Sequence, residues 1–537
     1  MRRELLNKIE REPFDAIIIG AGINGAGIAR DAALRGLRVL LLDKGDIASG
    51  TTAWSTRLIH GGLRYLEHGE LGLVRESLRE RERLLHIAPH LVRPLPLLIP
   101  LYRDARRAPL VVRIGLFIYD LLSCDKSLAA HRTLTRAEAL QRAPGLAAET
   151  LRGAALYYDA QVEYAERLAL ENALDAVGHG ASLLTYARVT RINEAQGRVC
   201  GVEFDDLLAG DSYRARAGVV VNAAGPWVDE IAAVASPASP RMIGGTKGSH
   251  IVVAPFASAP HDALYVEAQA DARPFFIIPW HELYLIGTTD VRYAGDLDKV
   301  VPDESEIAYL LNETNRVLPA AKLTRADVLY AYAGVRPLAY QTKDKTDSIT
   351  RRHFIHDHAP QLAGFISIVG GKLTTYRELA RQAVNLIYKK LQRTSPACVT
   401  AERALPGAAG PDFKTFSARF KAESDLPVAV SERLLRIYGM RAVEVLRLAE
   451  GDAELRAPFS AESNALGAEV VFAFRAELAV TLSDCLLRRT MVGLNRALGL
   501  DAVERAAQLA QEYLDWDEVR AAREVADYRR YIERFRP

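Results

Sequence analysis

The pattern of apolar and polar positions predicts a strand–helix–strand unit near the start of the chain. Phe14–Ile19 is a short apolar run rich in β-branched residues, which is typical of a buried parallel strand. Apolar residues then recur at helical spacing from Ile23 to Arg35, and Gly36 is well placed to end that helix. Val39–Leu42 predicts a second buried strand, with Asp43 at its end.

A glycine-rich turn, Gly20-Ala21-Gly22-Ile23-Asn24-Gly25, joins the first strand to the helix. Gly20 permits the tight turn, Gly22 lets a pyrophosphate approach the backbone, and Gly25 lets helix and strand pack closely. The helix N-terminus would face the phosphates, and Asp43 can hold a ribose hydroxyl. The complete unit predicts a dinucleotide site, whereas the glycines alone would also fit an ordinary α/β turn. Asp43 argues against NADP, whose 2′-phosphate it would repel.

Further strands and helices follow, in a pattern that predicts a nucleotide fold with an inserted second sheet. Strands are expected at Ala154–Tyr158, Leu183–Val189, Gly201–Phe204 and Ala217–Val221, with a helix at Ala165–Val177.

The second sheet is expected from short strands within Met242–Val291 and Val328–Leu338, which suit an antiparallel substrate-covering sheet. The chain then returns to the nucleotide fold with a buried strand at Phe365–Val369 and a helix at Tyr376–Leu391. The glycine- and threonine-rich turn between them, Gly370–Thr375, favours an anion or a flavin edge at the helix N-terminus.

The composition changes after a linker rich in proline and glycine. From Asp412 onward the chain is rich in Ala, Leu, Arg and Glu, with helical spacing and no strong strand. We therefore expect a separate helical domain, on which Arg488-Arg489-Thr490 would be solvated surface.

Length and charge restrict the function classes. A chain of 537 residues should hold two or three domains. The net charge of +2 gives no global field that points to nucleic acid. Four scattered cysteines indicate neither a disulfide framework nor a metal site. The charged start lacks the apolar core of a secretory signal, and no apolar run is long enough to span a bilayer.

One amphipathic segment, Leu110–Leu122, has the composition of an interfacial anchor, with arginines before it. Periodicity alone fits a plain core helix equally well. If the protein meets a membrane, it would lie on the surface.

Two motifs near the start of the chain are IIIGAGINGAGIARDAALRG and STRLIHGGLRYLEHGELGLVRESLRERERLL. With these motifs the sequence resembles the FAD-dependent (aerobic, quinone-linked) glycerol-3-phosphate dehydrogenase family. The resemblance covers nearly the whole chain and is looser beyond about Pro406. It continues through RIGLFIYDLL (Arg113–Leu122), VVNAAGPWV (Val220–Val228), KGSHIVV (Lys247–Val253), IPW (Ile278–Trp280), IGTTDV (Ile286–Val291), YAGVRPL (Tyr332–Leu338) and GGKLTTYRELA (Gly370–Ala380).

The resemblance implies a fold: an α/β, two-dinucleotide-binding-type FAD domain, an antiparallel-sheet substrate domain and an all-α C-terminal domain. The FAD-dependent region would span 13–395. Its discontinuous FAD-binding domain would comprise roughly 13–90, 151–230 and 335–395. The linker would be 396–411 and the helical domain 412–537.

The resemblance also implies an activity. The family oxidises sn-glycerol 3-phosphate to dihydroxyacetone phosphate by hydride transfer to FAD and passes the electrons to a membrane quinone, ubiquinone or menaquinone. We therefore expect a peripheral protein on the cytoplasmic face of the inner membrane, with a second copy of the chain as a candidate homodimer partner. Nucleic acid is not an expected partner, and no metal is expected.

The substrate chemistry requires cations, a base and a hydride acceptor. A phosphate carries about −1.5 to −2 charges at neutral pH, and arginine can engage two of its oxygens at once. By resemblance, Arg336 and Arg351 bind the phosphate, and Arg64, Tyr65 and Thr289 line the same pocket. No side chain accepts hydride, but flavin does.

His250 is the expected general base, with Lys372 or His60 as alternatives and a satisfied core histidine as the other interpretation of His250. Lys372 would contact the substrate or the flavin edge, so the expected catalytic residues are His250, Arg336 and Lys372. The expected FAD contacts are Gly20, Gly22, Asn24, Gly25, Asp43, Thr51, Thr52, Ser55, His60, Gly62, Val189, Ala224, Gly225, Gly371, Lys372, Leu373 and Thr375.

Three other functions stay open at this point. A soluble glycerophosphate oxidase would hand the electrons to oxygen, and an amine oxidase of the glycine/sarcosine type would bind a carboxylate with similar arginines. A non-catalytic binder on the same fold would carry no flavin and would be colourless.

Overall fold

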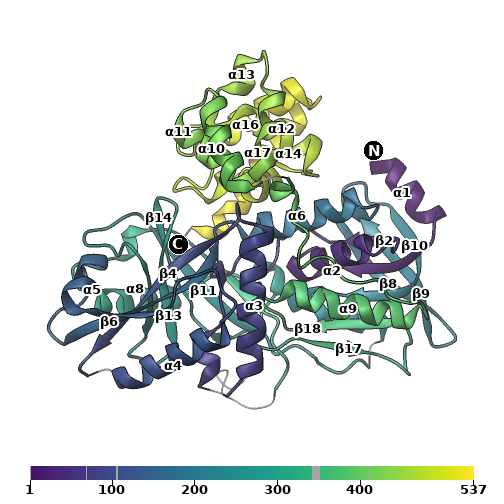
Figure 1. The fold of residues 1–537 in the computed structure, drawn as a ribbon. Helices are drawn as coiled ribbons and strands as arrows, with labels where there is room; N and C mark the ends of the chain where they lie inside the picture. Colours follow the sequence, from purple (N-terminus) through teal and green to yellow (C-terminus); the bar gives the residue numbers. More distant parts are fainter. Residues whose placement is uncertain are drawn as a thin grey trace.

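The computed structural model describes residues 2–67, 69–104, 107–236, 238–341, 351–410 and 412–536. Two sheet-based domains lie side by side, and the C-terminal helices form a cap over them (Figure 1). In this described part of the chain, no helix is long and apolar enough to cross a membrane.

The nucleotide-type sheet is built around β1 (Phe14–Ile19). This strand pairs in parallel with β10 (Ser212–Asn222) on one side and with β2 (Val39–Leu42) on the other. Outside these, β18 (Phe365–Val369) pairs with β10 and β7 (Ser182–Leu184) pairs with β2, again in parallel. The carboxyl ends of these strands therefore meet at one edge of the sheet, where open α/β sheets bind their ligands.

Three helices cover one face of this sheet. Helix α2 (Ile23–Leu34) packs between α6 (Ala165–Gly178) and α9 (Tyr376–Lys390), as the helical spacing predicts. The expected strand Leu183–Val189 is two strands, because Tyr186 adopts a left-handed φ of 57° between them. The remaining elements of this domain are α1 (Arg2–Arg11), β8 (Ala187–Ala195), β9 (Arg198–Asp206), η2 (Gly225–Trp227), α7 (Val228–Ala235) and β17 (Phe354–Asp357).

The second sheet is mixed, with ten strands in the described residues, and lies against the first domain. All its pairs are antiparallel except that of β4 with β12. Its strands are β3 (Leu58–Ile59), β4 (Val92–Tyr102), β5 (Arg132–Thr135), β6 (Leu151–Val162), β11 (Thr246–Val253), β12 (Ala263–Glu267), β13 (Pro274–Trp280), β14 (Leu283–Gly287), β15 (Val291–Arg292) and β16 (Val328–Arg336). The accompanying helices are η1 (Leu63–Leu66), α3 (Leu71–Ile87), α4 (Pro109–Leu122), α5 (Arg136–Arg142), η3 (Leu297–Lys299), α8 (Glu304–Val317) and η4 (Arg325–Asp327).

Two expectations about this sheet need correction. Strand β6 pairs with β4 along its whole length and therefore belongs to the second sheet. The FAD-binding segment that was expected to begin at residue 151 begins only after Val162. Strand β4 itself was not predicted, because Pro94, Pro96 and Pro100 break the pattern. These prolines lie an even number of residues apart, so the backbone N–H groups that they lack all belong to one edge of the strand. The N–H groups along the other edge remain available for pairing.

The C-terminal domain is mainly helical, with one short β-hairpin that the expectation of an all-α domain missed. The preceding segment is packed rather than loose: Leu405 is fully buried, and the Gly407 N–H donates to Glu171 on α6 at 3.0 Å. The domain's elements are η6 (Pro406–Ala408), α10 (Phe413–Glu423), α11 (Val428–Tyr438), η7 (Gly439–Arg441), α12 (Ala442–Leu448), α13 (Ala453–Arg456), β19 (Pro458–Ser460), β20 (Ala465–Leu466), α14 (Gly467–Ala476), α15 (Leu482–Asp484), η8 (Cys485–Arg489), η9 (Val492–Leu494), α16 (Val503–Tyr513), α17 (Glu518–Ile532) and η10 (Glu533–Phe535).

Candidate active site

A cavity of about 1090 Å³ lies where the carboxyl ends of β1 and β2 face the second sheet. This volume is slightly above the roughly 300–1,000 Å³ that is typical of small-molecule and cofactor pockets. The cavity brings together most of the residues expected to bind cofactor and substrate. Those that line it are Gly20, Gly22, Asn24, Asp43, Thr51, Thr52, Ser55, His60, Tyr65, Val189, Ala224, Gly225, His250, Arg336, Arg351, Gly371, Lys372 and Leu373.

Asp43 and the glycine turn form one end of the cavity. Gly20 has a φ of +105°, and a side chain there would come within 2.6 Å of the Ala223 carbonyl oxygen. The Asp43 carboxylate accepts the N–H groups of Ala21 at 2.6 Å and Gly45 at 2.8 Å. Burial raises the pKa of Asp43, and these two hydrogen bonds oppose the rise. Each carboxylate oxygen keeps a second lone pair, which is what a ribose hydroxyl requires.

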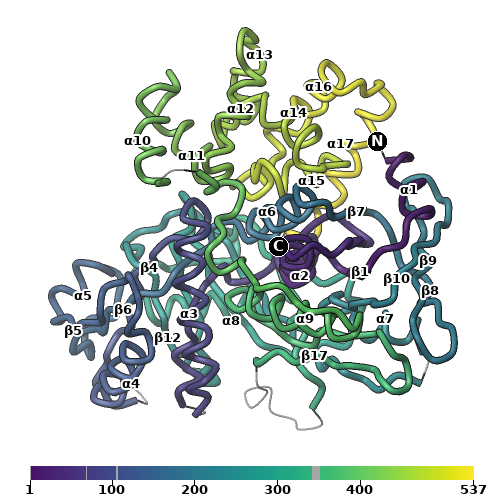
Figure 2. Tube along the Cα trace, turned by 45° about the vertical axis from the view of Figure 1, so that its right-hand side comes forward, coloured from purple at the N-terminus to yellow at the C-terminus, as the bar shows by residue number. Residues whose placement is uncertain are grey.

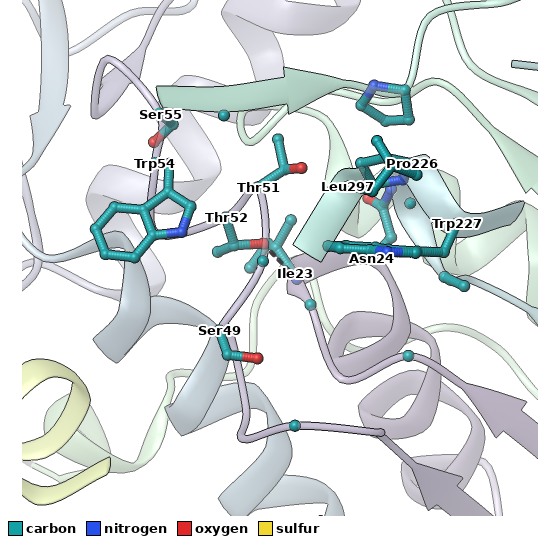
Figure 3. Close-up of a pocket in the computed structure, with 18 of the residues that line it drawn as sticks. Ile23, Asn24, Ser49, Thr51, Thr52, Trp54, Ser55, Pro226, Trp227 and Leu297 are labelled. Atoms are coloured by element: carbon teal, nitrogen blue, oxygen red, sulfur yellow. Dashed lines mark hydrogen bonds between the residues drawn. The ribbon is translucent and has the colours of Figure 1, made fainter. Parts of the chain in front are cut away.

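The first turn of α2 meets a hydroxyl-rich segment that crosses in front of it. The Thr52 hydroxyl accepts the N–H of Ile23 at 3.1 Å (Figure 3). Thr51 instead donates to the Val335 carbonyl oxygen at 2.7 Å, and so ties this segment to the second sheet. The segment therefore caps the helix that would face a pyrophosphate and joins both domains at the cavity.

Four buried polar atoms on the cavity residues have no hydrogen-bond partner in the described protein. They are Asn24 Oδ1, Arg57 Nε, Trp227 Nε1 and His250 Nδ1. Buried polar atoms are nearly always hydrogen-bonded, so these four fit a polar ligand that reaches both domains. Figure 3 shows Asn24 and Trp227 among the residues that line the cavity.

A cluster of cations lies at the other end of the cavity. Arg336, at the end of β16, donates to Asp290 at 3.1 Å and to the Thr288 hydroxyl at 3.0 Å. Arg351 lies 3.9 Å from the same carboxylate. Burial would raise the pKa of Asp290, but the two arginines lower it below its usual range, and burial lowers the pKa of Arg336 to about 10. Arg336 and Arg351 thus present two guanidinium groups beside one carboxylate, an arrangement that can bind a phosphate.

Gly248 on β11 makes room for Arg336. A Cβ atom at this position would lie 2.6 Å from the Thr288 hydroxyl and closer still to Arg336 Nη2. Its φ is not in the left-handed region, so close approach, and not backbone conformation, requires glycine here.

Lys372 lies between the cation cluster and helix α3. Its Nζ donates to Ser77 at 2.9 Å and lies 4.2 Å from the centre of the Tyr65 ring. Burial and Arg351 lower the pKa of Lys372 to about 7, against the opposing effect of Glu76. A lysine with this pKa is partly neutral at pH 7 and can accept a proton.

The two candidate histidines are poorer proton acceptors. Burial, with Arg336 and Arg57 nearby, lowers the pKa of His250 well below its usual value. Its Nε2 lies 2.9 Å from the Thr56 hydroxyl, and its ring stacks on Tyr332. Burial and Lys372 lower the pKa of His60 to about 3.

Five expected site residues do not line this cavity. The Thr289 side chain is buried and donates to Glu306 at 2.6 Å, so only its backbone carbonyl oxygen contacts Arg336. Gly25 allows close packing on Gly20, and Thr375 is buried before helix α9. Gly62 starts η1 in a left-handed conformation, and Arg64 follows it in η1.

Other residues of the site were not expected from the sequence. Thr56 and Asp290 orient His250 and Arg336, and Trp227 offers an unpaired N–H. Asp290 follows Thr289 in the turn after β14, and this position at the end of a strand would have suggested it as a site residue. No local signal marks Arg488 and Tyr531, which reach the cavity from the C-terminal domain.

Comparison with known proteins gives matches over both parts of the chain. Residues 15–377 match the model of the FAD dependent oxidoreductase family, and residues 398–521 match the C-terminal domain of alpha-glycerophosphate oxidase. A glycerol-3-phosphate dehydrogenase from Synechocystis is 45% identical, over 98% of this chain and 97% of its own. The chain belongs to the FAD-dependent glycerol-3-phosphate dehydrogenase family.

Two further matches bear on this family member's cofactor and substrate. The structure of glycerol-3-phosphate dehydrogenase from Bacillus halodurans complexed with FAD has a TM-score of 0.79 at 28% identity and covers 99% of this chain and 97% of its own. D-erythritol 1-phosphate dehydrogenase from Brucella abortus is 38% identical, over 94% of this chain and 98% of its own. The cofactor of this dehydrogenase is FAD, which fits the glycine turn, Asp43 and the unpaired polar atoms.

Proposed function

We propose that this dehydrogenase oxidises the C2 alcohol of sn-glycerol 3-phosphate to dihydroxyacetone phosphate. The observation that carries the proposal is the Arg336–Asp290–Arg351 cluster, which opens into the same cavity as the glycine turn. A phosphate of about −1.5 to −2 charges would find two guanidinium groups already oriented by one carboxylate.

Asp290 holds Arg336 in place before the substrate arrives. The carboxylate and the Thr288 hydroxyl fix the guanidinium plane, so less side-chain freedom is lost on binding. Arg336 and Arg351 then bind the phosphate end, which places the neighbouring C2 alcohol toward Lys372.

Lys372 accepts the proton of the C2 hydroxyl. Its pKa of about 7 suits a base near neutral pH, whereas the pKa of His250 is too low. His250 would instead orient the substrate through Nδ1, which has no partner among the described residues. FAD, when bound, supplies the hydride acceptor that no side chain provides. Val189, Trp227 and Leu373 contribute apolar surface to the cavity wall.

The electrons are passed to a membrane quinone, and helix α4 is the part of the chain that lies on the membrane. Its outer face carries Leu110, Ile114, Phe117 and Leu121, which are 63%, 51%, 65% and 64% exposed. These positions fall on one side of the helix, whereas Leu116 on the opposite side is buried. An exposed apolar stripe of this kind is typical of a helix that lies in a membrane interface.

The substrate is tested by anaerobic reduction of the bound flavin. Glycerol 3-phosphate should reduce it at a lower concentration than D-erythritol 1-phosphate, whose longer carbon chain must fit between Lys372 and the second sheet. If D-erythritol 1-phosphate reduced the flavin at the lower concentration, the longer ester would be the substrate. Reduction by sarcosine alone would favour an amine oxidase.

The electron acceptor is tested on the reduced enzyme. A soluble quinone analogue should reoxidise the flavin faster than oxygen does, with little peroxide. A peroxide yield equal to the substrate consumed, unchanged by quinone, would make the protein a glycerophosphate oxidase.

A further inference from the structure

Two arginines of the C-terminal domain are buried against the segment that follows β2. Arg488 Nε lies 2.5 Å from the Asp46 carboxylate, and Arg489 binds the same group through two nitrogens at 2.7 and 2.8 Å. All three side chains are at most 5% exposed. The expectation that Arg488-Arg489 is solvated surface is therefore wrong. Burial would raise the pKa of Asp46, but the two arginines lower it below its usual range.

Asp46 belongs to the same short segment as Asp43. This segment is fixed to the glycine turn, because the Ala48 N–H donates to the Ala21 carbonyl oxygen at 3.1 Å. It is fixed to β8 as well, since the Ala187 N–H donates to the Asp43 carbonyl oxygen at 2.7 Å. Its third attachment is the C-terminal domain, which holds Asp46 through a charge-assisted, bidentate contact.

A second contact joins the C-terminal domain to the same end of the cavity. The Tyr186 hydroxyl donates to Asp484 at 2.7 Å, and Asp484 also accepts from Arg488 at 2.7 Å. Tyr186 and Arg488 both line the cavity beside Asp43. The ion pair and the tyrosine contact therefore form one connected network around the position expected for the ribose.

The C-terminal domain also supplies part of the cavity wall. Thr481, Ser483, Tyr531 and Arg534 line the cavity together with Arg488. The end of the chain extends from the helical cap toward the two sheet-based domains (Figure 2).

The last residues bridge to the second sheet. Arg534 donates to the Asp298 carbonyl oxygen at 2.9 Å, and Asp298 pairs with Lys44 at 2.6 Å. The Phe535 ring lies 4.9 Å from that of Trp54, another cavity residue. The wall is thus anchored on both sides of the opening.

We propose that the C-terminal domain completes the FAD site by closing the cavity over the adenosine half of the cofactor. Arg488 and Arg534 place two guanidinium groups on this wall, where the pyrophosphate and ribose of FAD need cationic and hydrogen-bonding partners. Release of FAD then requires the domain to open, so cofactor retention depends on residues more than 400 positions away from the glycine turn.

The test is the rate of FAD release from the full-length holoenzyme, followed by the fluorescence of free flavin after dilution. R534Q removes a partly exposed wall residue, and R488Q leaves the bidentate Arg489–Asp46 pair in place. Each variant should release FAD at least about tenfold faster than the unmodified protein, because a charge-assisted contact is lost.

R433Q is the matched control. Arg433 is 14% exposed and pairs with buried Glu469 inside the same domain, and it does not line the cavity. This variant should lower the melting temperature and leave the release rate unchanged.

ADP carries the adenosine half and the pyrophosphate alone and serves as a second probe. It should compete with FAD for the apoprotein less effectively in R534Q than in the unmodified protein. The proposal would be overturned if R534Q released FAD and bound ADP as the unmodified protein does. It would also be overturned if R433Q released FAD as fast as R534Q does. If R488Q does not fold, R534Q decides.

Discussion

Gly248 leaves room for the guanidinium group of Arg336, the proposed phosphate ligand. A methyl group there would overlap the Arg336 guanidinium and the Thr288 hydroxyl. We expect Gly248→Ala to raise the KM for glycerol 3-phosphate about 10- to 100-fold, since Arg336 must leave its oriented position. The flavin content should not change. Steady-state kinetics with flavin absorbance measure both quantities.

Gly178→Ala is the control for this substitution. Gly178 ends helix α6, and a Cβ atom there meets nothing within 4 Å. Its KM should equal that of the unmodified protein. A normal KM in Gly248→Ala would mean that Arg336 does not hold the phosphate.

Lys372 should give the reaction its pH dependence. Because its pKa is lowered to about 7, the amine loses its proton as the pH rises through 7 and becomes able to act as a base. We expect kcat/KM to rise with pH through an apparent pKa of about 7 and to be level above it. Lys372→Gln should remove this limb and lower kcat by roughly 10²- to 10⁴-fold.

His250→Asn distinguishes the two candidate bases. If Lys372 is the base, this variant keeps the rise near pH 7 even if its KM increases. Loss of the rise in His250→Asn, with the rise retained in Lys372→Gln, would assign the proton transfer to His250.

The positions of individual site residues can be predicted from the sequence where they depend on local spacing. Gly20, Gly22 and Asp43 occupy the expected positions because one strand–turn–helix–strand unit places them all. Thr289 failed as a pocket residue, since a motif does not tell which way a side chain points. The Asp46–Arg488 pair joins residues 442 positions apart, and no periodicity predicts such a contact.

At the level of elements, β1, α2, β2 and α9 follow directly from the apolar pattern. The placement of β6 in the second sheet did not, because a strand's sequence does not name its partner. Strand β4 could not be predicted because proline usually interrupts a strand. Only the sheet shows that its prolines all face the same edge of the strand.

The turn after β2 offers a test of the cofactor site at this scale. In Asp43→Asn the amide cannot accept from both Ala21 and Gly45, so the turn loses one of its two backbone contacts. We expect weaker FAD binding by about 10- to 100-fold and a loss of about 1–3 kcal/mol in the free energy of unfolding. Fluorescence titration with FAD and denaturant unfolding measure these effects.

Asp15→Asn is a suitable control. Asp15 lies on β1, next to β2, and accepts the Arg38 N–H at 2.8 Å, but it does not line the cavity. It should lower stability without weakening FAD binding. Equal FAD affinity in Asp43→Asn and the unmodified protein would remove Asp43 from the ribose site.

Helix α4 allows a test of membrane association. The double variant Phe117→Glu with Leu121→Glu should bind anionic lipid vesicles at least about tenfold more weakly in a sedimentation assay, because charge replaces apolar surface that the membrane would cover. The control is Val519→Glu on α17, where the valine is 77% exposed. Equal binding by the double variant would show that another surface contacts the membrane.

On the scale of the whole molecule, one cavity joins three parts of the chain. The nucleotide fold supplies the glycine turn, the second sheet supplies Arg336, and the C-terminal domain supplies Arg488. The proposed function therefore depends on one cavity, in which a flavin and a small phosphorylated alcohol would meet between two domains.

Anaerobic mixing of the flavin-loaded enzyme with glycerol 3-phosphate or glycerol, followed at the flavin absorption band, tests the proposed function most directly. Glycerol 3-phosphate should bleach the flavin in a rapid, saturable phase, and glycerol at the same concentration should not. Bleaching by both alcohols at the same rate, or by neither, would contradict a site organised around the phosphate.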